Sequence, residues 1–179
     1  MDLMAMTTKL TYGLHVVSVK DAERGRFGGF IIDAVCQLSM GDEPVYCFSV
    51  MNKNFSKGLI AEAGVFNCSI LPEDPTPFVI ANFGFQSGKD VDKWAIARAE
   101  GVAFTEKGGL PVLDEAVAWG QFTVFDKREW DTHTTFFCHP ADADYVNADK
   151  EPLRYADYFT KLKDPVMAAF AAYKEKAGK

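Results

Sequence analysis

The sequence predicts a mainly β domain, a closed or partly closed antiparallel barrel with short helices at its periphery. Three observations support this class. Short β-branched or aromatic segments are separated by glycine, proline and charged turns, which is typical of antiparallel strands. Strands and helices do not alternate regularly, as they would in a βαβ fold. The 179 residues, 48% of them hydrophobic, suit one domain, which we expect to span residues 1–179.

The N-terminal half is expected to be rich in strands, with helices placed between them. After the third strand, Ser56 is expected to cap a short helix over residues 57–63, which Gly64 ends. Thr76–Pro77 begins a second short helix that ends near Gly84. The four strands are expected at residues 10–19, 29–40, 44–52 and 64–71.

The C-terminal half is expected to hold two long strands and a final helix. The strands follow a glycine-rich passage and cover residues 112–126 and 131–139, with further strand near 143–147. Asp164–Pro165 is a strong helix start, because the acid suits the N-cap and the proline suits the first helical position. Apolar residues then recur at helical spacing, so the last helix is predicted at about 164–177.

Composition excludes several classes of protein. The chain has 19 Lys and Arg against 25 Asp and Glu, and its net charge of -6 argues against a nucleic-acid partner. No apolar run approaches the roughly 18 residues that span a bilayer, and the first residues do not resemble a signal peptide. We therefore expect no membrane association and a cytoplasmic location. The four cysteines form no C-x-x-C pair and are expected to be reduced and buried.

Common nucleotide-binding fingerprints are absent. The sequence contains no G-x-G-x-x-G, and Gly88–Lys89 is followed by Asp90 where a P-loop needs Ser or Thr. A Rossmann domain and a P-loop NTPase are therefore not expected.

A polar, partly basic segment runs from the end of the third expected strand into a helix N-terminus. Free backbone N–H groups and the helix dipole favour an anion there, and Lys53 adds a cation that suits phosphate. The simpler interpretation is that Ser56 only caps the helix and Lys53 is solvated. A second polar stretch, residues 86–89, can converge on the same anion. The candidate ligands are Ser49, Asn52, Lys53, Asn54, Ser56, Ser87, Gly88 and Lys89.

The second expected strand has one polar face. Alternation places Leu38 and Met40 on the core face, and Asp33, Gln37 and Ser39 on the other. The simpler interpretation is that this polar face meets solvent, as antiparallel strands often do. Gln37 and Ser39 nevertheless form a plausible pair of donors for a ligand.

His133 is the candidate catalytic side chain. It lies in a strand-like segment, and imidazole is suited to acid–base and donor work near neutral pH. The alternative is a buried, hydrogen-bonded structural histidine, which is the role expected of His15. Cys138 and His139 supply too few ligands for a metal site, so none is predicted.

Six segments together point to one known family. They occur in the family's order with its gaps over roughly residues 9–158, and they resemble the flavin reductase-like, FMN-binding split-barrel proteins. The segments are Leu10-Thr11-Tyr12-Gly13-Leu14 with Val16-Val17, Ala34-x-x-Gln37, Ser49-Val50-x-Asn52-Lys53-x-x-Ser56, Phe83-Gly84-Phe85-x-Ser87-Gly88-Lys89-Asp90-Val91-Asp92-Lys93, Thr132-His133-Thr134 and Glu151-Pro152-Leu153-x-Tyr155.

This resemblance implies a six-stranded Greek-key split barrel that forms a homodimer, with FMN in a groove near the subunit interface. Gln37, Leu38 and Ser39 would lie along the isoalloxazine ring. Asn52, Lys53 and Ser56 would hold the phosphate, with further donors from residues 87–89. His133 matches the histidine that such reductases place near the nicotinamide of NADH or NADPH.

Three positions depart from the family pattern. Asp33 stands where the family usually has Asn, and a carboxylate near the flavin would disfavour its reduced anion. Cys138-His139-Pro140 replaces the usual Gly-Glu-Val, and the proline suggests an edge or an early end to that strand. Trp94 replaces a phenylalanine and is expected to act in packing.

Three functional hypotheses remain open on the sequence. The first is an enzyme that transfers a hydride from NAD(P)H to flavin and passes electrons to a flavin, ferric or protein acceptor. The second is a non-enzymatic carrier that holds FMN and exchanges electrons with partner proteins. The third is a split barrel that has lost flavin and serves as a structural dimer.

Overall fold

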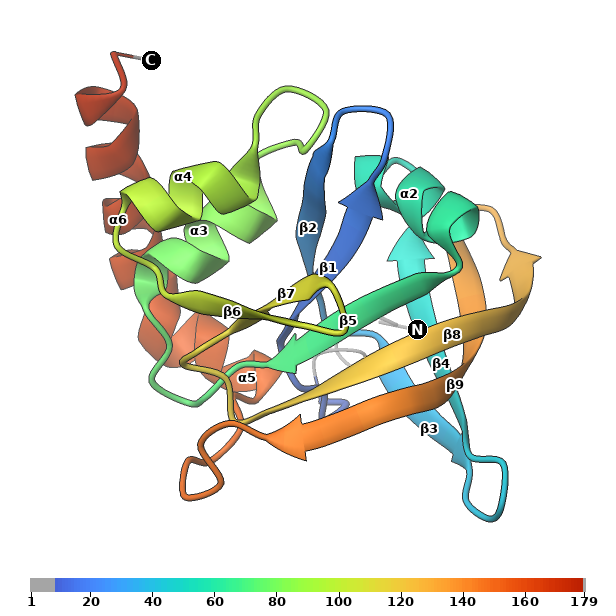
Figure 1. Cartoon of the computed structure of the whole chain (residues 1–179). Helices are drawn as coiled ribbons and strands as arrows, with labels where there is room; N and C mark the ends of the chain where they lie inside the picture. Colours follow the sequence, from blue (N-terminus) through green and yellow to red (C-terminus); the bar gives the residue numbers. More distant parts are fainter. Residues whose placement is uncertain (1–8, 179) are drawn as a thin grey trace.

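The computed structural model describes residues 9–178 and shows a curved antiparallel sheet that wraps into a split barrel (Figure 1). Seven strands form the sheet in the order β2-β1-β5-β8-β9-β4-β3. Their bounds are His15–Asp21 for β1, Arg26–Ile32 for β2, Val35–Ser39 for β3, Val45–Met51 for β4, Val65–Ile70 for β5, Ala118–Glu129 for β8 and His133–Tyr145 for β9. The predicted mainly β class and split barrel are confirmed.

The sheet has seven strands instead of the expected six, because the single strand expected over residues 29–40 is divided. It breaks at Asp33–Ala34, where the Val35 amide donates to the Asp33 carbonyl at 2.9 Å. The two halves, β2 and β3, then lie at opposite edges of the sheet. One continuous strand cannot occupy both edges, so the chain has to turn at this point.

Among residues 9–178, the helices longer than one turn are Phe55–Ala63 for α2, Pro77–Phe85 for α3, Lys93–Ala99 for α4 and Lys163–Lys176 for α6, and they surround the barrel. Figure 1 shows α2 over one end of the barrel and α3, α4 and α6 grouped on one flank. Helix α4 and the hairpin of β6 (Phe104–Lys107) and β7 (Leu110–Leu113) were not predicted. Each of these elements is short, and α4 depends on Asp92, whose carboxylate accepts from the Trp94 and Ala95 amides at 3.1 and 3.0 Å.

The end of the chain becomes helical earlier than predicted. A short helix α5 (Tyr155–Asp157) and a π-helical turn η1 (Tyr158–Leu162) precede α6, and Pro165 lies inside the first turn of α6. A proline is tolerated there because the first amides of a helix have no intrahelical partner. The predicted start at residue 164 was therefore too late.

Strand β9 is continuous through Pro140, so of the two outcomes expected for this proline the early strand end is wrong and the edge position is confirmed. Its pairing with β4 stops at Cys138, and beyond that point β8 is its one partner among residues 9–178. Pro140 therefore sits on a sheet edge, where its missing N–H leaves no ladder bond unmade. A bulge opposite Gln121 and Phe122 accommodates it.

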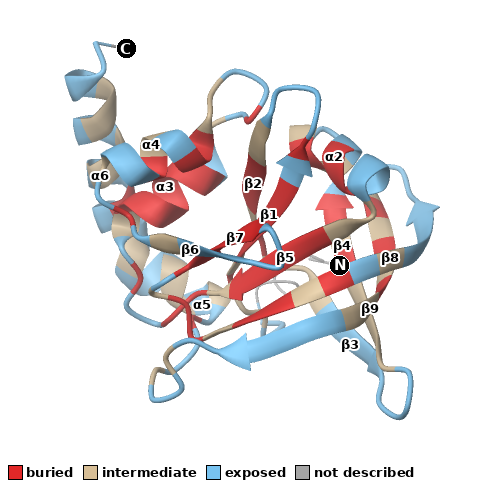
Figure 2. Ribbon diagram, viewed as in Figure 1, coloured by how far each residue is buried: buried red, intermediate tan, exposed pale blue. Residues whose placement is uncertain are grey.

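Two apolar cores stabilise the molecule. One fills the barrel and centres on Phe48, Phe66 and Phe136; the other lies between the sheet and the flanking helices. Figure 2 shows the buried residues concentrated in the barrel strands and in α3, whereas β3 is mostly exposed. The expectation that Leu38 and Met40 face a core is wrong for the single chain, since they are 51% and 79% exposed.

A pair of glycines lets the helices approach the sheet closely. A Cβ at Gly29 would come within 2.8 Å of the Phe83 and Trp94 rings, and the Trp94 indole donates to the Gly28 carbonyl at 3.0 Å. Helices α3 and α4 are thereby held against β2. Trp94 therefore acts in packing, as expected.

No helix among the described residues is long and apolar enough to cross a membrane.

Candidate functional site

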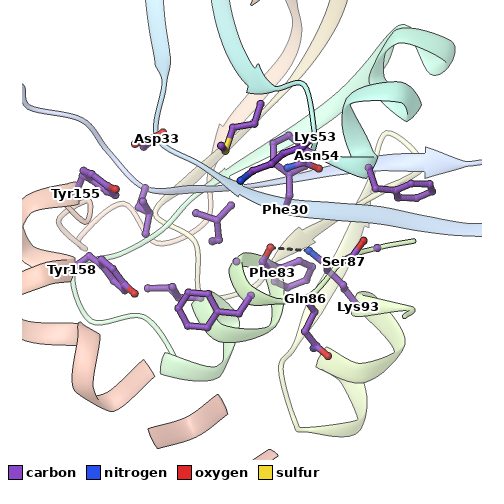
Figure 3. A pocket seen from close by; sticks show the side chains of 18 residues that line it. Phe30, Asp33, Lys53, Asn54, Phe83, Gln86, Ser87, Lys93, Tyr155 and Tyr158 are labelled. Carbon is purple, nitrogen blue, oxygen red and sulfur yellow. Dashed lines mark hydrogen bonds between the residues drawn. The ribbon is translucent and has the colours of Figure 1, made fainter. Parts of the chain in front are cut away.

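A cavity of about 550 Å³ opens between β2, the start of α2 and the C-terminal end of α3. Figure 3 shows that its polar groups gather at two ends, with apolar side chains such as Phe30 and Phe83 between them. One end holds Lys53, Asn54, Ser87 and Lys93, and the other holds Asp33, Tyr155 and Tyr158. A cavity of this volume accommodates a ligand of cofactor size.

The N-terminus of α2 forms one wall of the basic end. Asn54 is the N-cap, because its side-chain oxygen accepts from the Ser56 amide at 2.9 Å. This corrects the prediction that Ser56 is the cap; Ser56 is the second helical residue and is 1% exposed. Lys53 is exposed beside the cap, so the helix dipole and an exposed cation face the same space.

The loop after α3 forms the opposite wall. Gly88 packs against α2 so closely that a Cβ on it would lie 3.3 Å from the Phe55 ring. Arg26 holds this loop in place by donating to the Gly88 carbonyl at 2.6 Å. Two segments that are distant in the sequence, residues 53–54 and 87–88, therefore line one cavity, and their convergence on one anion stays a prediction.

Lys93 is a buried cation at the same end. Its side-chain amine donates to the Phe83 carbonyl at 2.8 Å, and it is 4% exposed. Burial lowers the pKa of Lys93 to about 8. Among residues 9–178 no carboxylate lies within ion-pairing distance of it. A buried cation without a counter-ion is a site that an anionic ligand would stabilise.

The other end of the cavity carries one carboxylate and two phenols. Burial raises the pKa of Tyr155, and the neighbouring Asp33 and Tyr158 raise it further. Burial also raises the pKa of Tyr158. Both phenols therefore stay protonated near neutral pH and can donate hydrogen bonds. The Asp33 carboxylate gives this end a negative charge, opposite to the basic end.

Several predicted ligands lie outside this cavity. Gln37, Leu38 and Ser39 are exposed on the edge strand β3, and Lys89 is exposed beyond the cavity wall. Ser49 lies on β4, where its hydroxyl accepts from Thr135 at 3.3 Å. Asp33 connects the cavity to β3, so a planar ligand that extends past Asp33 would run toward residues 35–37.

Asn52 and His133 lie at the β8–β9 hairpin, beside the cavity and not in it. The Asn52 amide donates to the Trp130 and Asp131 carbonyls at 2.9 and 3.1 Å and accepts from the Thr134 hydroxyl at 2.7 Å. These three hydrogen bonds hold the Asn52 side chain against the β8–β9 hairpin. His133 bonds to the Thr132 hydroxyl at 2.8 Å and lies opposite Met51, a residue that lines the cavity.

Sequence reasoning missed four polar residues of the site. Arg26, Lys93, Tyr155 and Tyr158 were given no binding role, although Lys93 and Tyr155 stand in the family-like segments. The local sequence does not show that Lys93 is buried, because its burial results from the packing of α3 and α4 against β2. No local signal distinguishes Tyr158 from the exposed aromatic residues around it.

Comparison with known proteins identifies the family. The model of the flavin reductase like domain matches residues 6–162. A curated relative, the high molecular weight rubredoxin of Moorella thermoacetica, is 32% identical over 160 residues. That match covers 88% of this chain and 66% of the relative, so the chain spans just under two thirds of that protein.

Solved structures share the fold at lower identity. The NADH:FAD oxidoreductase SgcE6 of Streptomyces globisporus superposes with a TM-score of 0.74 at 17% identity, covering 87% of each chain. The styrene monooxygenase flavin reductase of Pseudomonas putida S12 gives 0.70 at 23% identity, covering 87% of this chain and 94% of that one. The match of the family model over most of the chain, together with the shared fold, shows that this protein belongs to the flavin reductase-like family.

Proposed function

We propose that the protein binds FMN in the cavity and transfers a hydride from NADH or NADPH to this FMN. The electrons would then pass to a flavin, ferric or protein acceptor. The observation that carries this proposal is the basic end of the cavity, where the α2 N-terminus, Lys53, Ser87 and buried Lys93 converge. That donor set fits a phosphate dianion, and the apolar middle of the cavity fits a planar ring.

The residues of this chain would bind and orient the cofactor, and bound FMN would supply the redox centre. Lys53 and Lys93 would neutralise the phosphate, while Arg26 keeps the Gly88 loop in contact with α2. Phe30 and Phe83 would exclude water from the middle of the cavity. At the end of the cavity that holds Asp33, the carboxylate would oppose the negative charge of reduced flavin. The phenols of Tyr155 and Tyr158 at the same end can donate hydrogen bonds to the flavin.

An anaerobic titration tests this function directly. The protein is loaded with FMN, NADH and then NADPH are added without oxygen, and the visible flavin band is followed. Rapid bleaching with either nucleotide supports a reductase and shows which one it prefers. Bound flavin that stays yellow with both contradicts hydride transfer and favours an electron carrier.

The electron carrier is the second candidate function. It is favoured by the relative of Moorella thermoacetica, whose name describes it as a rubredoxin, and by Asp33 at the cavity wall. A carrier would bind FMN and take electrons from a reduced redox protein. The carrier role would be established if reduced rubredoxin reduces the bound FMN in a preparation whose FMN is not reduced by NADH or NADPH.

Lys53→Ala is expected to weaken FMN binding by about fivefold to tenfold and to leave riboflavin binding unchanged, because only FMN carries the phosphate. The loss should shrink at high salt, since Lys53 is exposed and its charge is screened. Flavin fluorescence quenching at two ionic strengths measures both ligands. An equal loss for FMN and riboflavin would contradict a phosphate contact.

His133→Ala is expected to slow flavin reduction by about tenfold while FMN affinity stays within twofold, because His133 lies beside the cavity wall and not in it. Stopped-flow bleaching by NADH measures the rate. His139→Ala is the matched control, since His139 lies further along β9 and bonds to the Pro44 carbonyl at 3.0 Å. Unchanged reduction in His133→Ala would remove this histidine from the mechanism.

We also propose that the protein is a homodimer that covers the open end of the barrel. Tyr145 is 70% exposed and borders a second, apolar cavity of about 550 Å³, and Met40, in the turn after β3, is 79% exposed. His15 lines that cavity; burial lowers its pKa to about 4, and its Nδ1 has no partner among the described residues. Water would not be a favourable neighbour for so much apolar surface.

Tyr145→Asp is expected to raise the dimer dissociation constant by at least about tenfold, because a carboxylate would be buried without a partner. Met167→Asp, on the exposed face of α6 at 49% exposure, is the matched control and should leave assembly unchanged. Sedimentation velocity over a concentration series measures both variants. A wild-type protein that is monomeric at micromolar concentration would refute the dimer.

A further inference from the structure

Two of the four cysteines lie directly opposite each other at the edge of the sheet. Cys36 on β3 pairs with Cys47 on β4 in the antiparallel register, so both side chains project from the same face. Opposed residues in such a ladder have Cα atoms roughly 4.5 to 5.5 Å apart, which lies within the range of about 4.4 to 6.8 Å found in disulfides. The backbone therefore already meets the distance requirement for a bridge.

The environments of the four thiols separate this pair from the other two. Cys36 is exposed and Cys47 is partly exposed, which corrects the expectation that all four are buried. Cys68 and Cys138 are buried, and burial raises the pKa of each to about 12. A buried thiol with so high a pKa supplies almost no thiolate for exchange.

Cys36 and Cys47 also interact with each other. The pKa of the Cys47 thiol is raised first by burial and then by the neighbouring Cys36 thiol. The exposed Cys36 Sγ lies 3.3 Å from the Gln37 carbonyl, at the outer surface of the edge strand. An oxidant would therefore reach Cys36 first and find Cys47 next to it.

The alternative bridge between Cys47 and Cys138 is excluded by the sheet itself. Cys138 on β9 lies opposite Tyr46, and both face the barrel interior. Cys47 follows Tyr46 in the strand and so projects from the other face. The sheet thus separates the Cys47 and Cys138 thiols.

We propose that Cys36 and Cys47 form a reversible disulfide that joins the edge strand β3 to β4. A low-molecular-weight disulfide is the oxidant. The Cys36 thiolate attacks it, releasing one thiol and leaving a mixed disulfide; Cys47 then loses its proton and attacks the Cys36 sulfur, releasing the second thiol. Two protein thiols are oxidised and one small disulfide is reduced to two thiols. The bridge is reversible because it is exposed to solvent and to reductants.

The bridge would secure the least protected strand of the sheet. Among the described residues 9–178, β3 pairs with β4 alone at the edge of the sheet; its side chains are mostly exposed (Figure 2), and its ladder contains a bulge between Gln37 and Ser39. A cross-link across this pair would limit its opening in the native chain and restrict the unfolded chain. The oxidised protein is therefore expected to melt about 5 °C higher than the reduced protein.

The test uses the full chain and oxidised glutathione as the probe. The protein is reduced, freed of reductant and incubated with millimolar oxidised glutathione; intact mass and peptide mapping then follow. The expected product has lost two hydrogen atoms, links the Cys36 and Cys47 peptides, and returns to the starting mass with dithiothreitol. Two thiols remain titratable in denaturant instead of four.

Single variants distinguish the bridge from simple thiol modification. Cys47→Ser should retain one glutathione on Cys36, because no second thiol resolves the adduct, and Cys36→Ser should react slowly. A wild-type protein that retains a glutathione adduct, links Cys47 to Cys138, or keeps four free thiols would overturn the proposal. Intact mass readouts on the wild type decide the outcome even if a variant folds poorly.

Discussion

Lys93→Met is expected to weaken FMN binding by about 10- to 100-fold while riboflavin binding changes by less than threefold. The size of the loss follows from burial: a charge-assisted hydrogen bond contributes roughly 1.5 to 3 kcal/mol, and Lys93 is 4% exposed, so water screens it little. Within the described part of the chain, the Phe83 carbonyl is the one partner of its amine. The phosphate would supply the missing negative charge.

The ratio of the two affinities makes this test specific. Removing the amine also leaves the Phe83 carbonyl without its donor, which destabilises the region for any flavin. Riboflavin reports that general effect, and the excess loss for FMN reports the phosphate contact. Lys127→Met, which removes an exposed lysine on β8, is the matched control and should change neither affinity. Equal losses for FMN and riboflavin in Lys93→Met would show that Lys93 is purely structural.

The same lysine predicts a pH dependence. Its pKa is about 8 in the folded protein against a usual 10.5, and a bound phosphate would raise it again. Binding then takes up a proton, so FMN affinity should fall as the pH rises above about 8, by up to tenfold per unit. In the flavin-free protein, the free energy of unfolding should fall as the pH drops from 10.5 toward 8, because in this range the unfolded chain takes up a proton on Lys93 more readily than the folded one. Lys93→Met should abolish both trends; titrations and melts from pH 7 to about 10.5 measure them.

Phe48→Ala is expected to lower the free energy of unfolding by about 3 to 5 kcal/mol, the largest stability change anticipated for this chain. The Phe48 ring is 1% exposed and meets the Phe66 and Phe122 rings edge-on at 4.8 and 4.7 Å. Truncation would leave a cavity in the middle of the barrel and remove both aromatic contacts. Urea unfolding of the flavin-free protein, at one fixed protein concentration, measures the loss.

Phe125→Ala is the control for this prediction. Phe125 is 52% exposed on β8 and packs mainly on the His139 ring at 4.4 Å. Its truncation should cost less than about 1 kcal/mol. Similar losses for the two variants would mean that the barrel interior does not carry the stability assigned to it.

Local sequence patterns were sufficient to predict most helices and strands and part of the basic end of the cavity. Alternating apolar residues indicated the long strands, and a polar segment before a helix indicated the α2 N-terminus with Lys53. Such signals are readable because they depend on neighbours within a few positions. The exact cap was not readable, because Asn54 and Ser56 are both good capping residues and packing buried Ser56.

The remaining features depend on contacts between distant segments. Strand order forces the break at Asp33–Ala34, which brings Asp33 to the cavity wall and leaves Gln37 on an exposed edge. The burial of Lys93 results from packing α3 and α4 against the glycines of β2, and the sequence around Lys93 does not contain that information.

The sequence by itself determined the barrel class and the segments able to meet an anion, because these follow from local patterns of polarity, branching and capping, and six motif segments carried its resemblance to the family. The tertiary structure decided which of those segments share a cavity, which cation is buried there, and which thiols face each other. Strand order and register set those distances, and both are fixed by how the whole sheet buries its apolar face.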